Sequence, residues 1–153
     1  MRANIAIQGL CSEELLSDWM WLLQKPYALV AMNNFGDMFL EDGNGHIHFL
    51  DLESGELKPA ASSTAELQQR TAQKENQRRW FFTDLLTPIE RAGLSLAPGQ
   101  CFGFKIPLVL GGKAEVSNIE IAQLLVRISL MGQIHRQVKN LPPGTKITDF
   151  KLG

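Results

Sequence analysis

The chain has 153 residues, of which 44% are hydrophobic and 20% are charged, and its formal net charge is −1 at pH 7. These values are typical of one globular domain, and they argue against a disordered chain and against direct nucleic-acid binding, which favours a basic domain. No apolar run is long enough to span a bilayer, and the first residues lack the pattern of a signal peptide, so we expect a cytoplasmic protein with no membrane partner.

A helix is expected first, from Ser12 to about Lys25. Ser12 suits the N-cap position, and the acids Glu13 and Glu14 in the first turn would interact favourably with the helix dipole. Apolar residues then recur at the spacing of one helical face, which predicts that this face is buried. Pro26 follows and ends the helix.

Three or four antiparallel strands are expected next, joined by tight turns. Runs rich in apolar and aromatic residues predict strands at residues 27–32, 35–40 and 46–52. The Asp-Gly-Asn-Gly sequence at residues 42–45 is a strong turn signal between the second and third of these strands. A shorter strand is expected at residues 57–58, just before Pro59.

The middle of the chain is predicted to be helical. Ser63 and Glu66 have the spacing of a capping box ahead of a polar run at residues 68–79, which either exposes a broad face or breaks near Asn76. Another helix is expected to begin at Thr87, with Pro88 at its first helical position and Gly93 at its C-terminal cap.

The last third alternates short apolar runs with Gly and Pro. A strand is expected at residues 101–110 and a helix near residues 121–140, because Gly and Pro mark the backbone points between them. Taken together, these elements predict an α+β fold, a mostly antiparallel sheet flanked by helices, in a single compact domain over residues 1–153.

Acidic residues are concentrated in the predicted hairpins. Residues 26–57 contain no Lys or Arg, whereas residues 101–153 carry seven basic residues against three acids. We expect the hairpin acids to form a partner-binding surface that serves association with a basic protein more than stability. Solvated turn acids without a partner are the alternative. The six acids are Asp37, Glu41, Asp42, Asp51, Glu53 and Glu56.

No metal site or cofactor site is expected. Asp42 and Asn44 resemble the start of a calcium loop, but Ile47 stands where the loop needs Gly. His46 and His48 share one strand face without a third ligand, which gives an incomplete transition-metal site. With only two distant cysteines in the chain, a disulfide framework or a zinc site built on cysteine is improbable.

No catalytic constellation is expected either. Cys101 and His135 are the one Cys/His pairing worth naming, and Cys101 in an apolar strand is predicted to be an inert buried thiol. Residues 111–113, Gly-Gly-Lys, lack the remainder of a phosphate-binding loop.

The alternative ligand site is a polar block in the last helix. It consists of Gln133, His135, Arg136 and Gln137. In an enzyme, His135 would act as the acid or base and Arg136 would clamp an anion. In the structural interpretation, which we favour, the two glutamines bond to backbone groups of the turn at residues 141–144 or of the Gly-Gly loop.

Several separated blocks of the chain resemble one bacterial family. They lie at residues 35–40, 42–51, 54–56, 99–112 and 129–146. In this order, they are similar to the C-terminal domain of type VI secretion immunity proteins that protect against DNase effectors, a family loosely similar to the SUKH immunity superfamily. The resemblance extends over about residues 14–147, with two departures. Lys113-Ala114 stands where an aromatic residue and an acid are common, and Arg127 stands where relatives carry a His.

The resemblance implies a binding protein rather than an enzyme. Such a protein would neutralise a cognate toxin, possibly a nuclease, by stoichiometric occlusion. An acidic surface is compatible with this function, because nuclease active sites are basic and an acidic partner can compete for the same groove. The alternatives are a small enzyme or ligand-binding domain that uses the His135 and Arg136 block, and a regulatory interaction domain.

Overall fold

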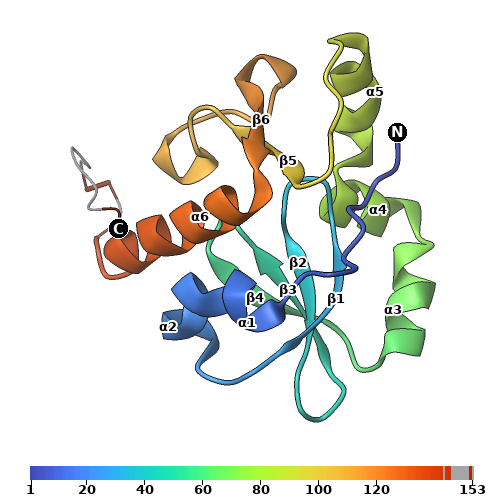
Figure 1. Ribbon diagram of the computed structural model, residues 1–153, viewed down its shortest axis with the longest axis vertical. Helices are drawn as coiled ribbons and strands as arrows, with labels where there is room; N and C mark the ends of the chain where they lie inside the picture. Colours follow the sequence, from blue (N-terminus) through green and yellow to red (C-terminus); the bar gives the residue numbers. More distant parts are fainter. Residues whose placement is uncertain (143, 146–151, 153) are drawn as a thin grey trace.

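Four antiparallel strands form the main sheet, in the order β1-β2-β3-β4 (Figure 1). The computed structural model describes residues 1–142, 144, 145 and 152. The strands are β1 (Ala28–Met32), β2 (Met38–Glu41), β3 (Ile47–Asp51) and β4 (Glu56–Ala61). The predicted α+β fold and its antiparallel sheet are therefore confirmed.

Two strand boundaries differ from the prediction. β2 begins at Met38 rather than at residue 35, because residues 33–37 form a turn in which Gly36 has a φ of +87°. Pro59 does not end β4, which continues to Ala61. β4 is an edge strand of the sheet, where a residue without a backbone N–H is tolerated. The turn predicted at residues 42–45 joins β2 to β3, with Gly45 at a φ of +84°.

The predicted first helix is broken into three short pieces. They are α1 (Ser12–Leu16), the 3-10 turn η1 (Ser17–Trp19) and α2 (Met20–Leu23). Cys11, not Ser12, holds the N-cap position of α1. The break brings the Trp19 indole to the Ile128 carbonyl at 2.9 Å. The backbone of residue 18 lies so close to Gly132 that a Cβ on this glycine would be 2.6 Å from the Asp18 carbonyl oxygen.

The middle segment forms three helices. They are α3 (Thr64–Thr71), α4 (Lys74–Phe81) and α5 (Thr83–Arg91). The Ser63 hydroxyl accepts a hydrogen bond from the Glu66 N–H at 3.1 Å, as the capping pattern predicts. The helix start predicted at Thr87 is wrong, because Pro88 lies inside α5, which begins directly after the left-handed Phe82. Gly93, at a φ of +78°, follows the C-cap of α5 as expected.

The last third forms a second, two-stranded sheet and the longest helix. Its elements are β5 (Gln100–Phe104), η2 (Leu108–Leu110), η3 (Val116–Asn118), β6 (Ile119–Gln123) and α6 (Leu124–Val138). The predicted strand at residues 101–110 ends early, at residue 104. The predicted helix begins three residues late because residues 119–123 pair with β5.

Apolar side chains cover both faces of the main sheet. On one face, Met38 and Leu40 pack with α1, η1 and α6, and on the other face Phe39 and Phe49 pack with Leu67 of α3 and Trp80 of α4. A third cluster joins α5 to the second sheet. It contains Phe35, Ile89, Phe102, Phe104 and Ile119. Among the helices of the described residues, none has the length and apolar character needed to cross a membrane.

Candidate functional site

Asp37, the first of the six hairpin acids, is buried rather than exposed. Only 1% of its surface is accessible. Its Oδ1 accepts the Leu52 N–H at 2.8 Å, and its Oδ2 accepts the Asn33 amide at 2.8 Å. Burial, followed by repulsion from Asp51, raises the pKa of Asp37 to about 7. The expected surface position is therefore wrong, and this carboxyl ties the turn before β2 to the end of β3.

Asp42 stabilises the hairpin turn. Its Oδ1 accepts the N–H groups of Asn44 at 2.8 Å and His46 at 3.1 Å, and its Oδ2 lies 3.1 Å from His48 Nε2. The hydrogen bond to His48 is the main cause that lowers the pKa of Asp42 to about 2. This carboxylate is occupied within the turn, with 9% of the residue exposed.

Glu53 is also buried, against the expectation of a surface acid. Its Oε1 forms an ion pair with Arg127 Nη2 at 2.9 Å, and its Oε2 accepts the Leu108 N–H at 2.7 Å. Arg127 also donates from Nε to the Phe35 carbonyl at 2.8 Å. The ion pair connects three segments, which are the end of β3, the loop that follows β5, and α6. It therefore has a structural role.

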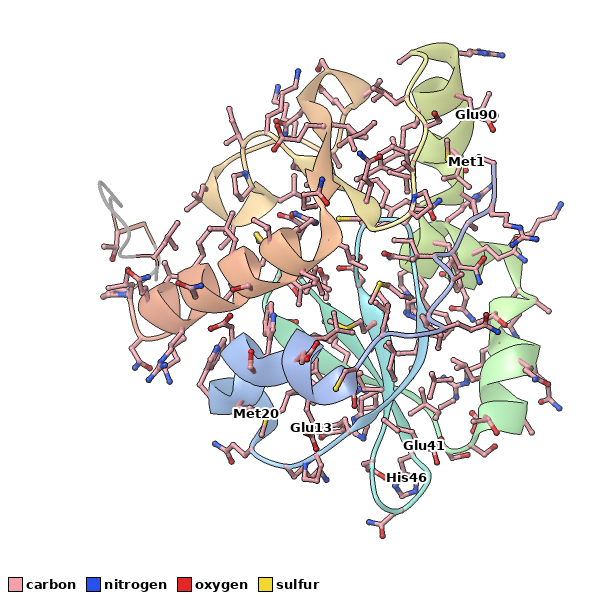
Figure 2. All side chains as sticks on the ribbon, viewed as in Figure 1. Met1, Glu13, Met20, Glu41, His46 and Glu90 are labelled. Atoms are coloured by element: carbon pink, nitrogen blue, oxygen red, sulfur yellow. The ribbon has the colours of Figure 1, made fainter. Side chains whose placement is uncertain are left out.

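The accessible acids are fewer than the sequence suggests. Glu56 is exposed, but it pairs with Lys58 at 3.3 Å. Asp51 is half-buried, and its Oδ1 accepts the Glu53 N–H at 2.9 Å. Glu41 is half-buried beside the hairpin tip, where Figure 2 labels it near His46. That these three residues contact a partner stays a prediction.

His135 of the alternative ligand block lies in the core. It is 4% exposed, its Nε2 lies 2.7 Å from the Leu52 carbonyl oxygen, and its ring lies 5.8 Å from that of Trp19. Because a carbonyl oxygen only accepts, Nε2 carries the proton of this hydrogen bond. Burial lowers the pKa of His135, which favours the neutral imidazole. Because the ring is buried, it cannot reach a substrate at the surface.

The other members of the block lie on the outer side of α6. Arg136 and Gln137 are exposed, and Gln133 donates to the Ser129 hydroxyl at 3.1 Å. Both glutamines have further partners in the protein. That they bond to the turn at residues 141–144 stays a prediction, since Pro143 lies outside the described residues.

Cys101 does not form a nucleophile–base pair with His135 in the part of the chain that the structure describes. Its thiol is fully buried, and burial raises its pKa to about 11. A thiolate is the reactive form of cysteine, and at neutral pH this side chain remains protonated. The inert thiol expected from the sequence fits this environment.

Two cavities lie away from the His135 block. The larger, of about 1020 Å³, lies between the N-terminal segment and residues 93–99. The Met1 amine and Glu90, labelled together in Figure 2, form a 2.5 Å ion pair at its side. The smaller, of about 380 Å³, borders His46 and His48. Over the described residues, no three His, Cys, Asp or Glu side chains converge on a metal position, and that no metal binds stays a prediction.

Five exposed apolar side chains in the loop after β5, in β6 and in the first turn of α6 are absent from the sequence prediction. They belong to Ile106, Val109, Ile121, Leu125 and Val126. The run Leu124-Leu125-Val126 in the predicted helix could have indicated exposed apolar side chains, because an ordinary amphipathic helix buries only one face and would leave part of this run exposed. We refer to these five residues as the apolar surface.

Comparison with protein families gives a match over about half of the chain. Residues 61–135 match the family described as "T6SS immunity protein Tdi1, C-terminal". The match confirms the resemblance to type VI secretion immunity proteins, over a narrower range than residues 14–147. It runs from the end of β4 into α6. A search of curated proteins finds no match to the chain.

Proposed function

We propose, from the match of residues 61–135 to a family of type VI secretion immunity proteins, that this chain binds a cognate effector and neutralises it. The family suggests an immunity role and implies a non-enzymatic one. The match is the single observation that carries the proposal. Neutralisation would be stoichiometric, with the effector's active site or its substrate path occluded in the complex.

The environment of the reactive side chains supports a binding role. The Cys101 thiol and the His135 ring are buried in the core, and the Asp37 carboxyl is enclosed by backbone and amide donors. An enzyme needs such groups within hydrogen-bond reach of a substrate. These side chains instead stabilise the fold.

The effector that we propose is a nuclease. A nuclease groove is basic because it holds phosphates, and accessible acids such as Glu41 and Glu56 would increase the rate of encounter with it. Neutralisation takes place in the cytoplasm of the producing cell, where an incoming nuclease would reach its substrate.

A titration tests the proposal. The neighbouring genes are examined for a toxin, its product is purified as the candidate effector, and its toxic activity is measured with increasing amounts of the protein. We expect activity to fall linearly and reach zero near one equivalent, with a 1:1 complex in size-exclusion chromatography with light scattering. Inactivation by a small fraction of one equivalent would indicate an enzyme. Absence of both complex and protection would refute the immunity function.

A further inference from the structure

β6 has an open edge. Two backbone hydrogen bonds show which residues of β6 direct their backbone groups toward β5. They join the Lys105 N–H to the Asn118 carbonyl and the Leu124 N–H to the Gly99 carbonyl. By strand alternation, Glu120 and Ala122 direct their N–H and C=O groups toward β5, and Ile119 and Ile121 direct theirs away. Among the described residues, no backbone hydrogen bond pairs the outward groups of Ile121.

The other edges of the two sheets are closed or blunted. The outer edge of β1 pairs with the N-terminal segment through Ile5 N–H to Met32 O at 3.0 Å, and β1 has a register shift between Leu29 and Ala31. β4 carries Lys58 and Pro59 at its edge. The outer side of β5 bonds to the Asn34 carbonyl. Proteins use such devices to prevent edge-to-edge pairing, and β6 lacks all of them except one charge, Glu120.

Exposed apolar side chains lie within this strand and in the first turn of the helix that follows it in the chain. Ile121 is 36% exposed within β6, and Leu125 and Val126 in the first turn of α6 are 56% and 63% exposed. The first turn of α6 carries no acidic residue, although acids are favoured there. Contiguous exposed apolar patches mark interaction sites.

The loop between β5 and β6 holds the rest of the apolar surface outward. The Asn118 side chain bonds to both backbone groups of Ile106, at 2.9 and 3.0 Å, and to the Lys113 carbonyl at 2.9 Å. Glu53 fixes the loop at Leu108 and, through Arg127, joins it to α6. Ile106 is 56% exposed in this braced loop. A surface that is ordered before binding loses less entropy in the complex.

We propose that the effector adds an extended strand to the open edge of β6 and packs its apolar side chains on the apolar surface. The Ile119 N–H already bonds to the Val116 carbonyl, so the Ile119 carbonyl and both backbone groups of Ile121 would give the hydrogen bonds of strand addition. Leu125, Val126 and Ile106 would give the apolar contacts. The inference rests on the proposed immunity function and adds to it the surface by which the protein would bind the effector. All five residues of the apolar surface lie inside the matched range 61–135, and all six hairpin acids lie outside it.

Two single substitutions test the surface. Ile121→Lys places a charge on the edge strand, and Val126→Lys places one on the most exposed apolar side chain of α6. We expect each to weaken binding of the purified neighbouring-gene effector at least about tenfold, as central interface residues do. The matched control is Met20→Lys, on α2 and away from β6 (Figure 1), where an exposed apolar residue also becomes Lys. Its affinity should stay within about twofold of the parent.

The outcomes separate the surface from the function. If the parent fails to bind the effector, both proposals fall. If the parent binds and both folded Lys variants bind equally well, the function stands and the β6 surface is wrong. If the parent is a dimer that Ile121→Lys converts to monomers while effector binding persists, a second copy of the chain occupies β6, which overturns the inference.

Hydrogen exchange gives a second test that needs no substitution. In the free protein, the outward amide of Ile121 should exchange much faster than the inward amide of Ala122, which bonds to β5. On adding the effector, exchange at Ile121 should slow at least about tenfold, with little change at Ala122. Unchanged exchange at Ile121 in a saturated complex would exclude strand addition at β6.

Discussion

The Arg127 guanidinium and the Glu53 carboxylate form a buried ion pair, with 2.9 Å between Nη2 and Oε1 and 5% and 7% of the two side chains exposed. The two residues are 74 positions apart in the chain. Through Leu108, the same carboxylate reaches the loop that carries part of the apolar surface. The pair therefore connects the stability of the main sheet to the position of the proposed interface.

Removal of one partner should destabilise the fold strongly. Arg127→Met leaves Glu53 buried without its counter-charge, and such a change costs about 3–5 kcal/mol. We expect the loss in urea unfolding monitored by circular dichroism. The double variant Arg127→Met/Glu53→Gln should lose less than the sum of the two single variants, because each single variant leaves one buried charge unpaired and the double variant leaves none. A single-variant loss below about 1 kcal/mol would indicate that the pair is solvated.

Gly55 should be irreplaceable because of His135. A Cβ at Gly55 would lie 2.5 Å from the His135 ring, and the residue has a φ of +70°. Gly55→Ala therefore combines left-handed backbone strain with a clash against a buried ring. Gly45→Ala is the matched control, since its φ is +84° but its surroundings are open. We expect a loss of about 1 kcal/mol for Gly45→Ala from strain alone and at least about twice that for Gly55→Ala. Equal losses in thermal unfolding would refute the contact.

Several signals within a few residues of one another predicted local structure correctly, although the local signals at Ser12, Pro59 and Thr87 did not. The turn at residues 42–45, the cap at Ser63 and the end of α5 at Gly93 depend on nearby backbone chemistry. Other features of the fold depend on contacts between segments that are distant in the sequence. The approach of Asp18 to Gly132 accompanies the break in the first helix, and pairing with β5 makes residues 119–123 a strand despite their position beside a helical pattern.

The candidate site was harder to predict than the fold. Counting charges located six acids in the hairpins, but it could not tell that Asp37 and Glu53 point inward. Their partners follow from tertiary packing, since Leu52 and Arg127 are brought to them by the sheet and by α6. The burial of His135 follows in the same way from its contacts with Leu52 and Trp19.

The contribution of Asp37 to stability should fall as the pH rises from about 4 to about 7. The pKa of Asp37 is raised from 3.8 to about 7 in the folded protein, so the folded state holds this proton over a range in which the unfolded chain has released it. Asp37→Asn should remove this contribution, so that its unfolding free energy rises relative to that of the parent as the pH increases through this window. In the control Asp42→Asn, the slope should change between about pH 4 and 2 instead, because the pKa of Asp42 is lowered to about 2 and its stabilisation is lost as the pH falls. An unchanged slope in Asp37→Asn would contradict the raised pKa.

The two cysteines should differ in reactivity. Cys11 is exposed, whereas Cys101 is buried and its pKa is raised to about 11. With a thiol-specific disulfide reagent at pH 8, we expect one rapid equivalent in the native protein and two after denaturation. Cys11→Ser should remove the rapid equivalent, and Cys101→Ser should leave it. Rapid labelling of Cys101 in the native state would indicate that the core around it opens readily.

The accessible acids should govern the rate of effector binding more than its lifetime. Glu41 and Glu56 lie outside the buried pairs, so Glu41→Lys/Glu56→Lys should leave the fold intact, with a stability change of about 0.5 kcal/mol or less per site. The same cannot be expected of Glu53→Lys, which would place two cations together in the core. If these acids face a basic effector, the double variant should associate more slowly, and its association rate should depend less on salt, with a nearly unchanged dissociation rate.

The control variant, Glu75→Lys/Asp84→Lys on α4 and α5, makes the same change in formal charge elsewhere on the surface. Stopped-flow association measured at several salt concentrations compares the two pairs. If both slow association equally, only net charge matters, and the hairpin acids hold no special position relative to the effector.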